Sequence, residues 1–172
     1  MCIRDRFKTI SEVGPNTDLI RKRAYGMIEV TDQRLVAIHF RPWPKLISTV
    51  EALWIGGWKH KQKPKTNSCK IYYNQPIAHR NYLALAYVES TSGTSYATLL
   101  RALYVLDHVA MLKRSDAIIC EVTNDRLSDR FLRRRGWEPY MEASKKRHWI
   151  RRFYGDYSSV EKKSLKIAEL AR

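Results

Sequence analysis

Two carboxylates stand at the ends of two apolar segments that are typical of buried strands. Glu89 follows the run Tyr82–Val88, and Glu121 lies in the run Ala117–Val122. A carboxylate held at the end of a strand can take a proton from an ammonium group, directly or through a water molecule. Each can equally form an ion pair with one of the many arginines. Glu89 and Glu121 are therefore candidate general bases, and an ion pair is the alternative role for each.

The elements that position these carboxylates are predicted by the segment that joins them. A turn of hydroxyl-bearing residues with Gly93 in it leads into a long helix that should end near Arg114. After the second strand, a polar corner at Asn124 precedes another helix, which should end at Gly136 because glycine favours the left-handed conformation after a helix. A strand, helix, strand order predicts two parallel strands joined by a crossover helix. We expect the chemistry where the first strand ends.

Elements on either side enlarge this unit to a mixed sheet. Alternating apolar residues predict a hairpin of Tyr25–Val30 and Leu35–Arg41, with Val36, Ile38 and Phe40 on one face. The further predicted elements are a helix through Leu46–Trp54, a strand Lys70–Tyr73, a last hairpin of Glu138–Glu142 and Arg147–Tyr154, and an amphipathic helix from Ser158. The expected class is α/β, with a mostly antiparallel mixed sheet, one parallel strand pair and flanking helices.

The chain is long enough for one folded domain, which we expect over residues 25–157. Residues 1–24 carry weak signals and no assigned element, and residues 1–6 resemble a translated sequencing adapter. Residues 158–172 form the predicted C-terminal helix. The three cysteines lack the spacing of a zinc site, so no metal ligands are assigned. Their odd number, without a signal sequence, predicts a cytoplasmic protein, and no apolar run is long enough for a membrane span.

Basic residues dominate the charge, with 32 Lys and Arg against 17 Asp and Glu, a net charge of +15. Such a field favours anionic partners, such as phosphorylated cofactors or nucleic acid. The side chains that would contact a nucleic acid lie on one helix and in one loop: Arg126, Arg130, Arg133, Arg134, Lys61 and Lys63. Trp149, Phe153 and Tyr154 lie near them in the sequence and would stack on bases. A solvated basic surface is the alternative.

The order of the predicted elements resembles the GNAT superfamily of acetyl-coenzyme A dependent N-acyltransferases. The resemblance covers about Met27 to Phe153. Its most specific part is Ser128–Trp137, which reproduces the pattern S-x-x-x-Φ-x-x-x-G-aromatic, where Φ is apolar. The turn Ser90–Ser95 keeps one glycine, Gly93, of the family's R/Q-x-x-G-x-G/A phosphate loop.

This resemblance implies an enzyme that moves an acetyl or other acyl group from acyl-coenzyme A to an amine. The two parallel strands would splay apart around the pantetheine arm, and the pyrophosphate would bind backbone N–H groups at the start of the next helix. The residues implied in cofactor binding are Val88, Ser90, Gly93, Thr94, Ser95, Tyr96, Asn124 and Ser128.

Two departures from the family pattern leave the reaction open. The leading Arg or Gln of the phosphate loop is absent, and Leu132 stands where the family often has a tyrosine that protonates the leaving thiolate. Leucine cannot donate a proton. A catalytically degenerate binding module with the same fold, and a basic nucleic-acid-binding protein, are therefore the alternatives to an N-acyltransferase. The amine acceptor is not predicted.

Overall fold

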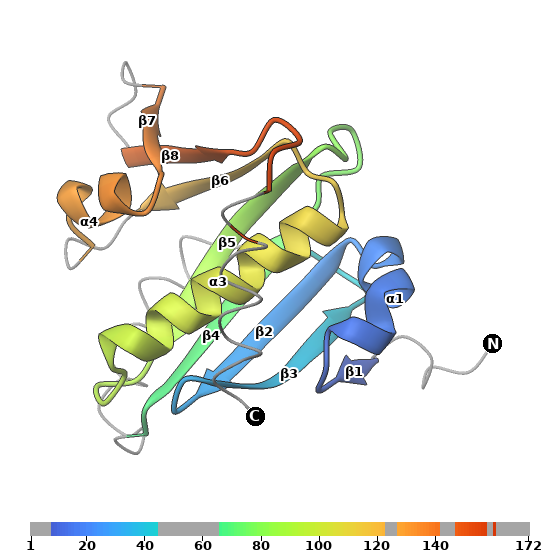
Figure 1. Cartoon of the computed structure of the whole chain (residues 1–172), viewed down its shortest axis with the longest axis horizontal. Coiled ribbons are helices and arrows are strands. Elements are labelled where there is room, and N and C mark those ends of the chain that lie inside the picture. The colour runs from blue at the N-terminus through green and yellow to red at the C-terminus, as the bar shows by residue number, and fades with distance from the viewer. Residues whose placement is uncertain (1–7, 45–65, 123–126, 142–146, 158–159, 161–172) are drawn as a thin grey trace.

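The computed structural model describes residues 8–44, 66–122, 127–141, 147–157 and 160. Among them one mixed sheet has the strand order β1-β3-β2-β4-β5-β6-β8-β7 (Figure 1). The strands are β1 Thr9–Ile10, β2 Tyr25–Thr31, β3 Arg34–Arg41, β4 Ser68–Asn74, β5 Tyr82–Ser90, β6 Ala117–Val122, β7 Glu138–Tyr140 and β8 Arg147–Arg152. The helices are the 3-10 turn η2 Gly14–Asn16, α1 Thr17–Lys22, α3 Tyr96–Leu112 and α4 Asp129–Arg134. The predicted α/β class, with one parallel strand pair in a mostly antiparallel sheet, is confirmed.

The predicted hairpin is confirmed as β2 and β3, and it contains a bulge. Its two-residue turn has φ of 48° at Asp32 and 64° at Gln33, which suits the right-handed twist of the paired strands. The register shifts midway, so that Val36 is an extra residue in β3. The alternation predicted Val36 on the buried face with Ile38 and Phe40, but Val36 is 46% exposed because the bulge turns it outward.

The core lies between α3 and one face of the central strands. The helix begins at the predicted cap, since the Ser95 hydroxyl accepts a hydrogen bond from the Thr98 amide at 3.2 Å. Its buried apolar residues are Ala102, Val105, Leu106, Val109 and Ala110. They pack with alternate strand residues, which are Ile28, Val30, Ile38, Phe40, Cys69, Ile71, Tyr73 and Leu83. The intervening residues of these strands therefore face away from α3.

The parallel pair is short, and this positions the candidate site. β5 and β6 pair from Tyr82 opposite Ala117 to Leu85 opposite Cys120. Beyond Leu85, β5 continues to Ser90 paired only with β4 among the described strands. Figure 1 shows β5 and β6 diverging toward their carboxyl ends, with the start of α3 near the end of β5.

The C-terminal part extends the sheet with the predicted hairpin. β8 lies between β6 and β7 and pairs antiparallel with both. α4 ends as predicted, with Gly136 at φ 78° and the Trp137 amide bonded to the Leu132 carbonyl at 3.1 Å. Arg151 of β8 forms a buried ion pair of 3.2 Å with Asp107 of α3. This pair joins the hairpin to the central helix.

Two elements occur where sequence signals were weak. β1 pairs antiparallel with β3, and α1 contacts α3. Ile10 and Ile20 are buried in the core. At the other end, Val160 is buried, and its carbonyl accepts a hydrogen bond from the Tyr104 hydroxyl at 2.9 Å.

Three predicted features lie outside the described residues. They are the helix through Leu46–Trp54, the loop with Lys61 and Lys63, and the polar corner with Asn124 and Arg126. Apart from Val160, the C-terminal amphipathic helix also falls there. In the part of the chain that is described, no helix has the length and apolar character needed to cross a membrane.

Candidate active site

The divergence of β5 from β6 opens one edge of β5 at the predicted site. Val88, Glu89 and Ser90 lie on the diverging part and pair with β4. Half of a strand's backbone N–H and C=O groups point toward each neighbour. The groups of residues 86–90 that point toward β6 have no partner strand in the described chain, so they can bind an extended ligand.

Cys120 lies where the paired part of the two strands ends. Burial raises the pKa of its thiol to about 12. A thiol with such a pKa is neutral at physiological pH, and the thiolate is the nucleophilic form. Cys120 therefore packs against the core as an apolar side chain and supplies no nucleophile.

The turn between β5 and α3 is held by its own hydrogen bonds. The Thr91 amide donates to the Thr94 hydroxyl at 2.9 Å, and the Thr94 amide donates to the Thr91 carbonyl at 3.1 Å. The Ser95 amide donates to Asn67 Oδ1 at 2.8 Å. Three amides near the predicted phosphate site are thus donors within the protein, while Gly93 and Tyr96 are exposed beside them.

Asn67 is a site-forming residue that sequence reasoning missed. Its side chain accepts from the Ser95 amide and also donates, through Nδ2, to Asp32 Oδ1 at 3.0 Å. Its backbone carbonyl accepts a hydrogen bond from the Asp32 amide at 3.0 Å. One side chain therefore links the β2–β3 turn to the start of α3. No local pattern reveals this link, since residues 32, 67 and 95 are far apart in the sequence.

The two candidate bases are not brought together. Glu121 directly follows the last β6 residue paired with β5, and lies opposite His148 of β8. Glu89 is four residues beyond Leu85 on the diverging strand. The difference of three residues corresponds to about 10 Å of strand. A single reacting amine would therefore meet one of these carboxylates, not both.

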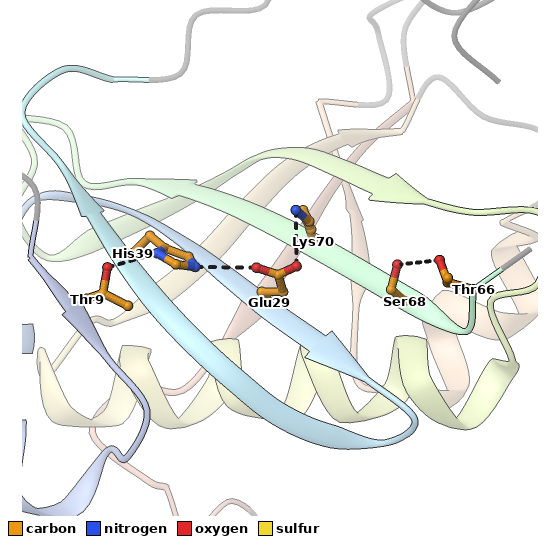
Figure 2. A network of polar contacts seen from close by, with 6 residues as sticks. All are labelled: Thr9, Glu29, His39, Thr66, Ser68 and Lys70. Atoms are coloured by element: carbon orange, nitrogen blue, oxygen red, sulfur yellow. Dashed lines mark hydrogen bonds and ion pairs between the residues drawn. The ribbon is translucent and has the colours of Figure 1, made fainter. Parts of the chain in front are cut away.

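Glu89 lies on the sheet face opposite α3, in a row of charged side chains. It faces Lys70 of β4 across the strand pair. Lys70 Nζ lies 3.1 Å from Glu29 Oε1, and Glu29 Oε2 lies 3.3 Å from His39 Nε2. His39 Nδ1 is in turn 2.9 Å from the Thr9 hydroxyl. Figure 2 shows this line of contacts running from Thr9 of β1 through His39 of β3 and Glu29 of β2 to Lys70 of β4.

This row lies at the edge of an open hollow of about 340 Å³. Its charged lining consists of Glu29, Lys70 and Glu89. The remaining lining residues all carry hydroxyl groups: Thr31, Thr66, Ser68 and Thr91. The Thr91 hydroxyl donates to the Thr66 carbonyl, so these two lining residues are bonded to each other. Every lining residue carries a polar group, and Glu89 is the only one of them predicted from the sequence.

Tyr96 connects the start of α3 with α4. Its ring packs edge-on against Phe131 with 5.4 Å between centroids. Its hydroxyl accepts a hydrogen bond from Arg135 at 3.0 Å. The ring remains largely exposed, so Tyr96 lines the open side of the region between β5 and α4. Ser128, the other described residue implied in cofactor binding on that side, caps α4 by accepting from the Phe131 amide at 3.3 Å.

The basic surface differs in part from the predicted one. Arg130, Arg133 and Arg134 are exposed on α4 as expected. Trp149 and Phe153 are buried, however, so they cannot stack on bases, and Arg133 lies over the Trp149 ring at 5.7 Å. The alternation of aromatic and basic residues in the sequence reflects packing here. The charge remains available to a polyanion, and of the three rings expected to stack only Tyr154, which is 76% exposed, is accessible.

Comparisons with known proteins show similarity to a solved structure and no matching family. No protein-family model matches the chain, and no curated protein matches it. The crystal structure of nourseothricin acetyltransferase is similar at a TM-score of 0.41 and 9% identity, covering 86% of this chain and 98% of that chain. At that level of similarity the comparison carries no argument about this chain's function.

The fold class therefore rests on the order and pairing of the strands. A hairpin, further antiparallel strands, a parallel pair with a crossover helix, and a last hairpin occur in the predicted order. This mixed α/β fold is consistent with a GNAT-like acyltransferase fold.

Proposed function

We propose that this protein is an N-acyltransferase that transfers an acetyl or other acyl group from acyl-coenzyme A to an amine. The observation that carries the proposal is the divergence of β5 from β6 after Leu85 and Cys120, next to the start of α3. It gives an extended ligand a strand edge to pair with. It also opens beside a carboxylate, Glu89, that can accept a proton.

Acyl-coenzyme A, the donor, would bind in this gap mainly to backbone groups of the protein. Residues 86–90 would bind the amides of the pantetheine arm, with Val88 and Ser90 on either side of Glu89. Gly93 and Tyr96 would lie along the phosphates, whereas the amides of Thr94 and Ser95 already donate within the protein. The phosphates would thus depend more on nearby cations such as Arg135 than the family pattern implies.

Glu89 is the proposed general base. The thioester of the donor supplies an activated acyl group. Glu89 takes a proton from the acceptor ammonium, and the amine nitrogen forms a bond to the acyl carbon. The carbon–sulfur bond then breaks to release the thiolate, and the nitrogen gives its second proton to solvent to leave a neutral amide. Glu121 is the alternative base. Leu132 is buried and cannot protonate the thiolate, which would take its proton from solvent.

Calorimetry with acetyl-coenzyme A tests the proposal. We expect binding with a dissociation constant between about 1 µM and 1 mM, the usual range for enzyme substrates. Release of free coenzyme A thiol in the presence of a panel of primary amines would then show turnover. The absence of binding at millimolar acetyl-coenzyme A would contradict the proposal and leave the fold unaffected.

A degenerate binding module is the second candidate. It is favoured by Leu132 in place of a proton donor and by the internally bonded amides of the turn. Binding of acetyl-coenzyme A without thiol release for any amine would support it. The nucleic-acid alternative predicts an affinity for DNA or RNA that falls steeply with salt, because phosphate contacts release counterions.

A further inference from the structure

One end of the sheet, opposite the candidate active site, gathers several connecting segments. Tyr25, the first residue of β2, lies opposite the last residues of β3 and β4. Ala117, the first residue of β6, lies opposite the first residue of β5 and the last residue of β8. Figure 1 shows the β4–β5 loop, the α3–β6 connection and the end of β8 together at the upper right, away from the start of α3 at the lower left. We call this surface the loop end, and it consists of residues 23–24, 42–44, 75–81, 113–116 and 153–156.

Backbone hydrogen bonds tie most of these segments to one another. The Gln75 amide donates to the Ala24 carbonyl at 2.8 Å, which joins the β4–β5 loop to the start of β2. At the other side of the same loop, the Asp116 amide donates to the Asn81 carbonyl at 2.6 Å. The Asp116 carbonyl in turn accepts from the Phe153 amide at 2.7 Å. The loop end is therefore one connected surface from the start of β2 to the end of β8.

The loop end carries three strongly exposed apolar side chains. Trp43, Ile77 and Tyr154 are 66%, 74% and 76% exposed, the three highest values for large hydrophobic residues in the described part of the chain. They follow β3, β4 and β8 respectively. β3 and β8 are five strand spacings apart in the sheet, which corresponds to about 24 Å. Apolar residues scattered singly over a surface are ordinary, but three at one end of a sheet indicate a contact surface.

Positive charge accompanies these apolar side chains. The basic residues of the same segments are Arg23, Arg80, Lys113 and Arg114, and the acidic ones are Asp116 and Asp156. Arg80 and Arg114 are exposed on the loops. Asp116 accepts a hydrogen bond from Asn81 Nδ2 at 2.8 Å, so its carboxylate is held within the protein. The surface thus combines exposed arginines with separate apolar tips.

We propose that the loop end binds an anionic membrane surface. Trp and Tyr side chains favour the membrane–water interface, an exposed Ile can enter the acyl boundary, and arginines attract anionic headgroups. The spacing favours a lipid surface over a protein partner, because a fluid bilayer can receive separate side chains while a protein would need a matching pocket for each. This inference is independent of the proposed reaction. The start of α3 lies at the other end of the sheet, so the candidate active site stays open to solvent on the membrane-bound protein.

Co-sedimentation of the full chain with vesicles tests this proposal. One set of vesicles is phosphatidylcholine alone, and the other is a three-to-one mixture of phosphatidylcholine and phosphatidylserine. We expect the partition coefficient to be at least about tenfold higher for the mixture and to fall as salt is added. Equal partition into both vesicles, or no sedimentation with either, would overturn the proposal.

Variants of the apolar tips separate insertion from attraction by charge alone. Trp43→Ser with Ile77→Ser should lower partition into the mixed vesicles at least about tenfold, because both side chains lose their contact with the acyl boundary. Tyr140→Ser with Met141→Ser is the matched control, since these residues are 42% and 58% exposed and lie at the opposite end of the sheet. The control should change partition less than about twofold. Equal losses for the two pairs would contradict insertion of the loop end, and melting temperatures report whether each variant is folded.

Charge variants test whether the arginines act at this surface or only through net charge. Arg80→Gln with Arg114→Gln should lower the preference for the mixed vesicles at least about tenfold. Arg130→Gln with Arg134→Gln removes the same charge from α4, whose side chains are also exposed, and should lower it much less. The same loss for both pairs would mean that net charge alone attracts the vesicles. Sedimentation velocity covers the other occupant: a wild-type dimer that Trp43→Ser with Ile77→Ser converts to a monomer would assign the loop end to a second copy of this chain and overturn the membrane proposal.

Discussion

Single side chains hold the candidate site, and Asn67 is the clearest case. It accepts from the Ser95 amide at the start of α3 and donates to Asp32 in the β2–β3 turn. Asn67→Ala removes both bonds and leaves a helix-start amide without its side-chain partner. We expect the free energy of unfolding to fall by about 1 to 2 kcal/mol, measured by urea denaturation.

Ser92→Ala is the control for this variant. Ser92 lies exposed in the same turn, and its replacement should change stability by less than about 0.5 kcal/mol. Equal stability of Asn67→Ala and Ser92→Ala would show that the link through Asn67 contributes nothing.

Lys113 makes stability depend on pH. Its ammonium lies 2.7 Å from the Arg23 carbonyl and 2.9 Å from Gln75 Oε1, and burial lowers its pKa to about 8, from 10.5 in the unfolded chain. Between these values the unfolded chain binds more protons, so this residue makes the free energy of unfolding rise with pH. We expect the wild-type protein to gain stability relative to Lys113→Met between pH 8 and pH 10, measured by urea denaturation.

The comparison with Lys113→Met is needed because two thiols act in the opposite direction. Burial raises the pKa of Cys69 and Cys120 to about 12, so their contribution to stability falls as pH rises above 9.0, their usual pKa. Both proteins share this loss, and it cancels in the difference. Parallel pH curves for the two proteins would contradict the role assigned to Lys113.

At the scale of elements, the end of α4 depends on one glycine. Gly136 has φ 78°, a conformation that costs other residues about 1 to 2 kcal/mol. Gly136→Ala should lower stability by that amount although nothing lies within 4 Å of the added methyl group. Gly14→Ala is the matched control, since Gly14 is equally uncrowded and its φ is not positive. Thermal and urea unfolding of both variants measure the difference.

The elements found from the sequence are those whose signals are local. β5, β6 and α3 are long apolar segments, and Ser95 and Gly136 mark helix ends by residue type. β1 and α1 are short and are held by contacts with β3 and α3, which no local pattern contains. The bulge at Val36 could not be predicted for the same reason, because it depends on the register of β3 with β2.

The candidate site was less predictable than the fold. Glu89 was found because it ends a strand. The hollow beside it is lined from β2, β4, β5 and the flanking turns, so its residues come together only through strand pairing. The stacking role of Trp149 and Phe153 was wrong because composition does not distinguish a buried ring from an exposed one.

At the scale of the whole molecule, one buried ion pair joins the C-terminal hairpin to the central helix. Arg151 and Asp107 are 11% and 8% exposed, and their side chains lie 3.2 Å apart. Arg151→Met leaves the Asp107 charge buried without this partner, so the free energy of unfolding should fall by about 3 to 5 kcal/mol. Urea denaturation measures the loss, and Arg151→Met with Asp107→Leu should recover most of it.

The neighbouring residue provides the control. Arg152 pairs with Glu138, whose side chain is 62% exposed. Arg152→Met should cost less than about 1 kcal/mol, because exposed ion pairs contribute little. Similar losses for the two arginine variants would mean that the hairpin is not held by the buried pair.

The short parallel pairing also has a consequence for hydrogen exchange. Along residues 87–90, beyond the β4–β5 bulge at Ala86, backbone amides that bond to β4 are protected, whereas those directed toward β6 have no strand partner in the described chain. Deuterium uptake should therefore alternate, slow and fast, along these residues, while residues 83–85 exchange slowly. A ligand that pairs with this edge would abolish the alternation by slowing the fast amides alone. Exchange at four consecutive residues would thus report occupancy of the gap before the ligand's chemistry is known.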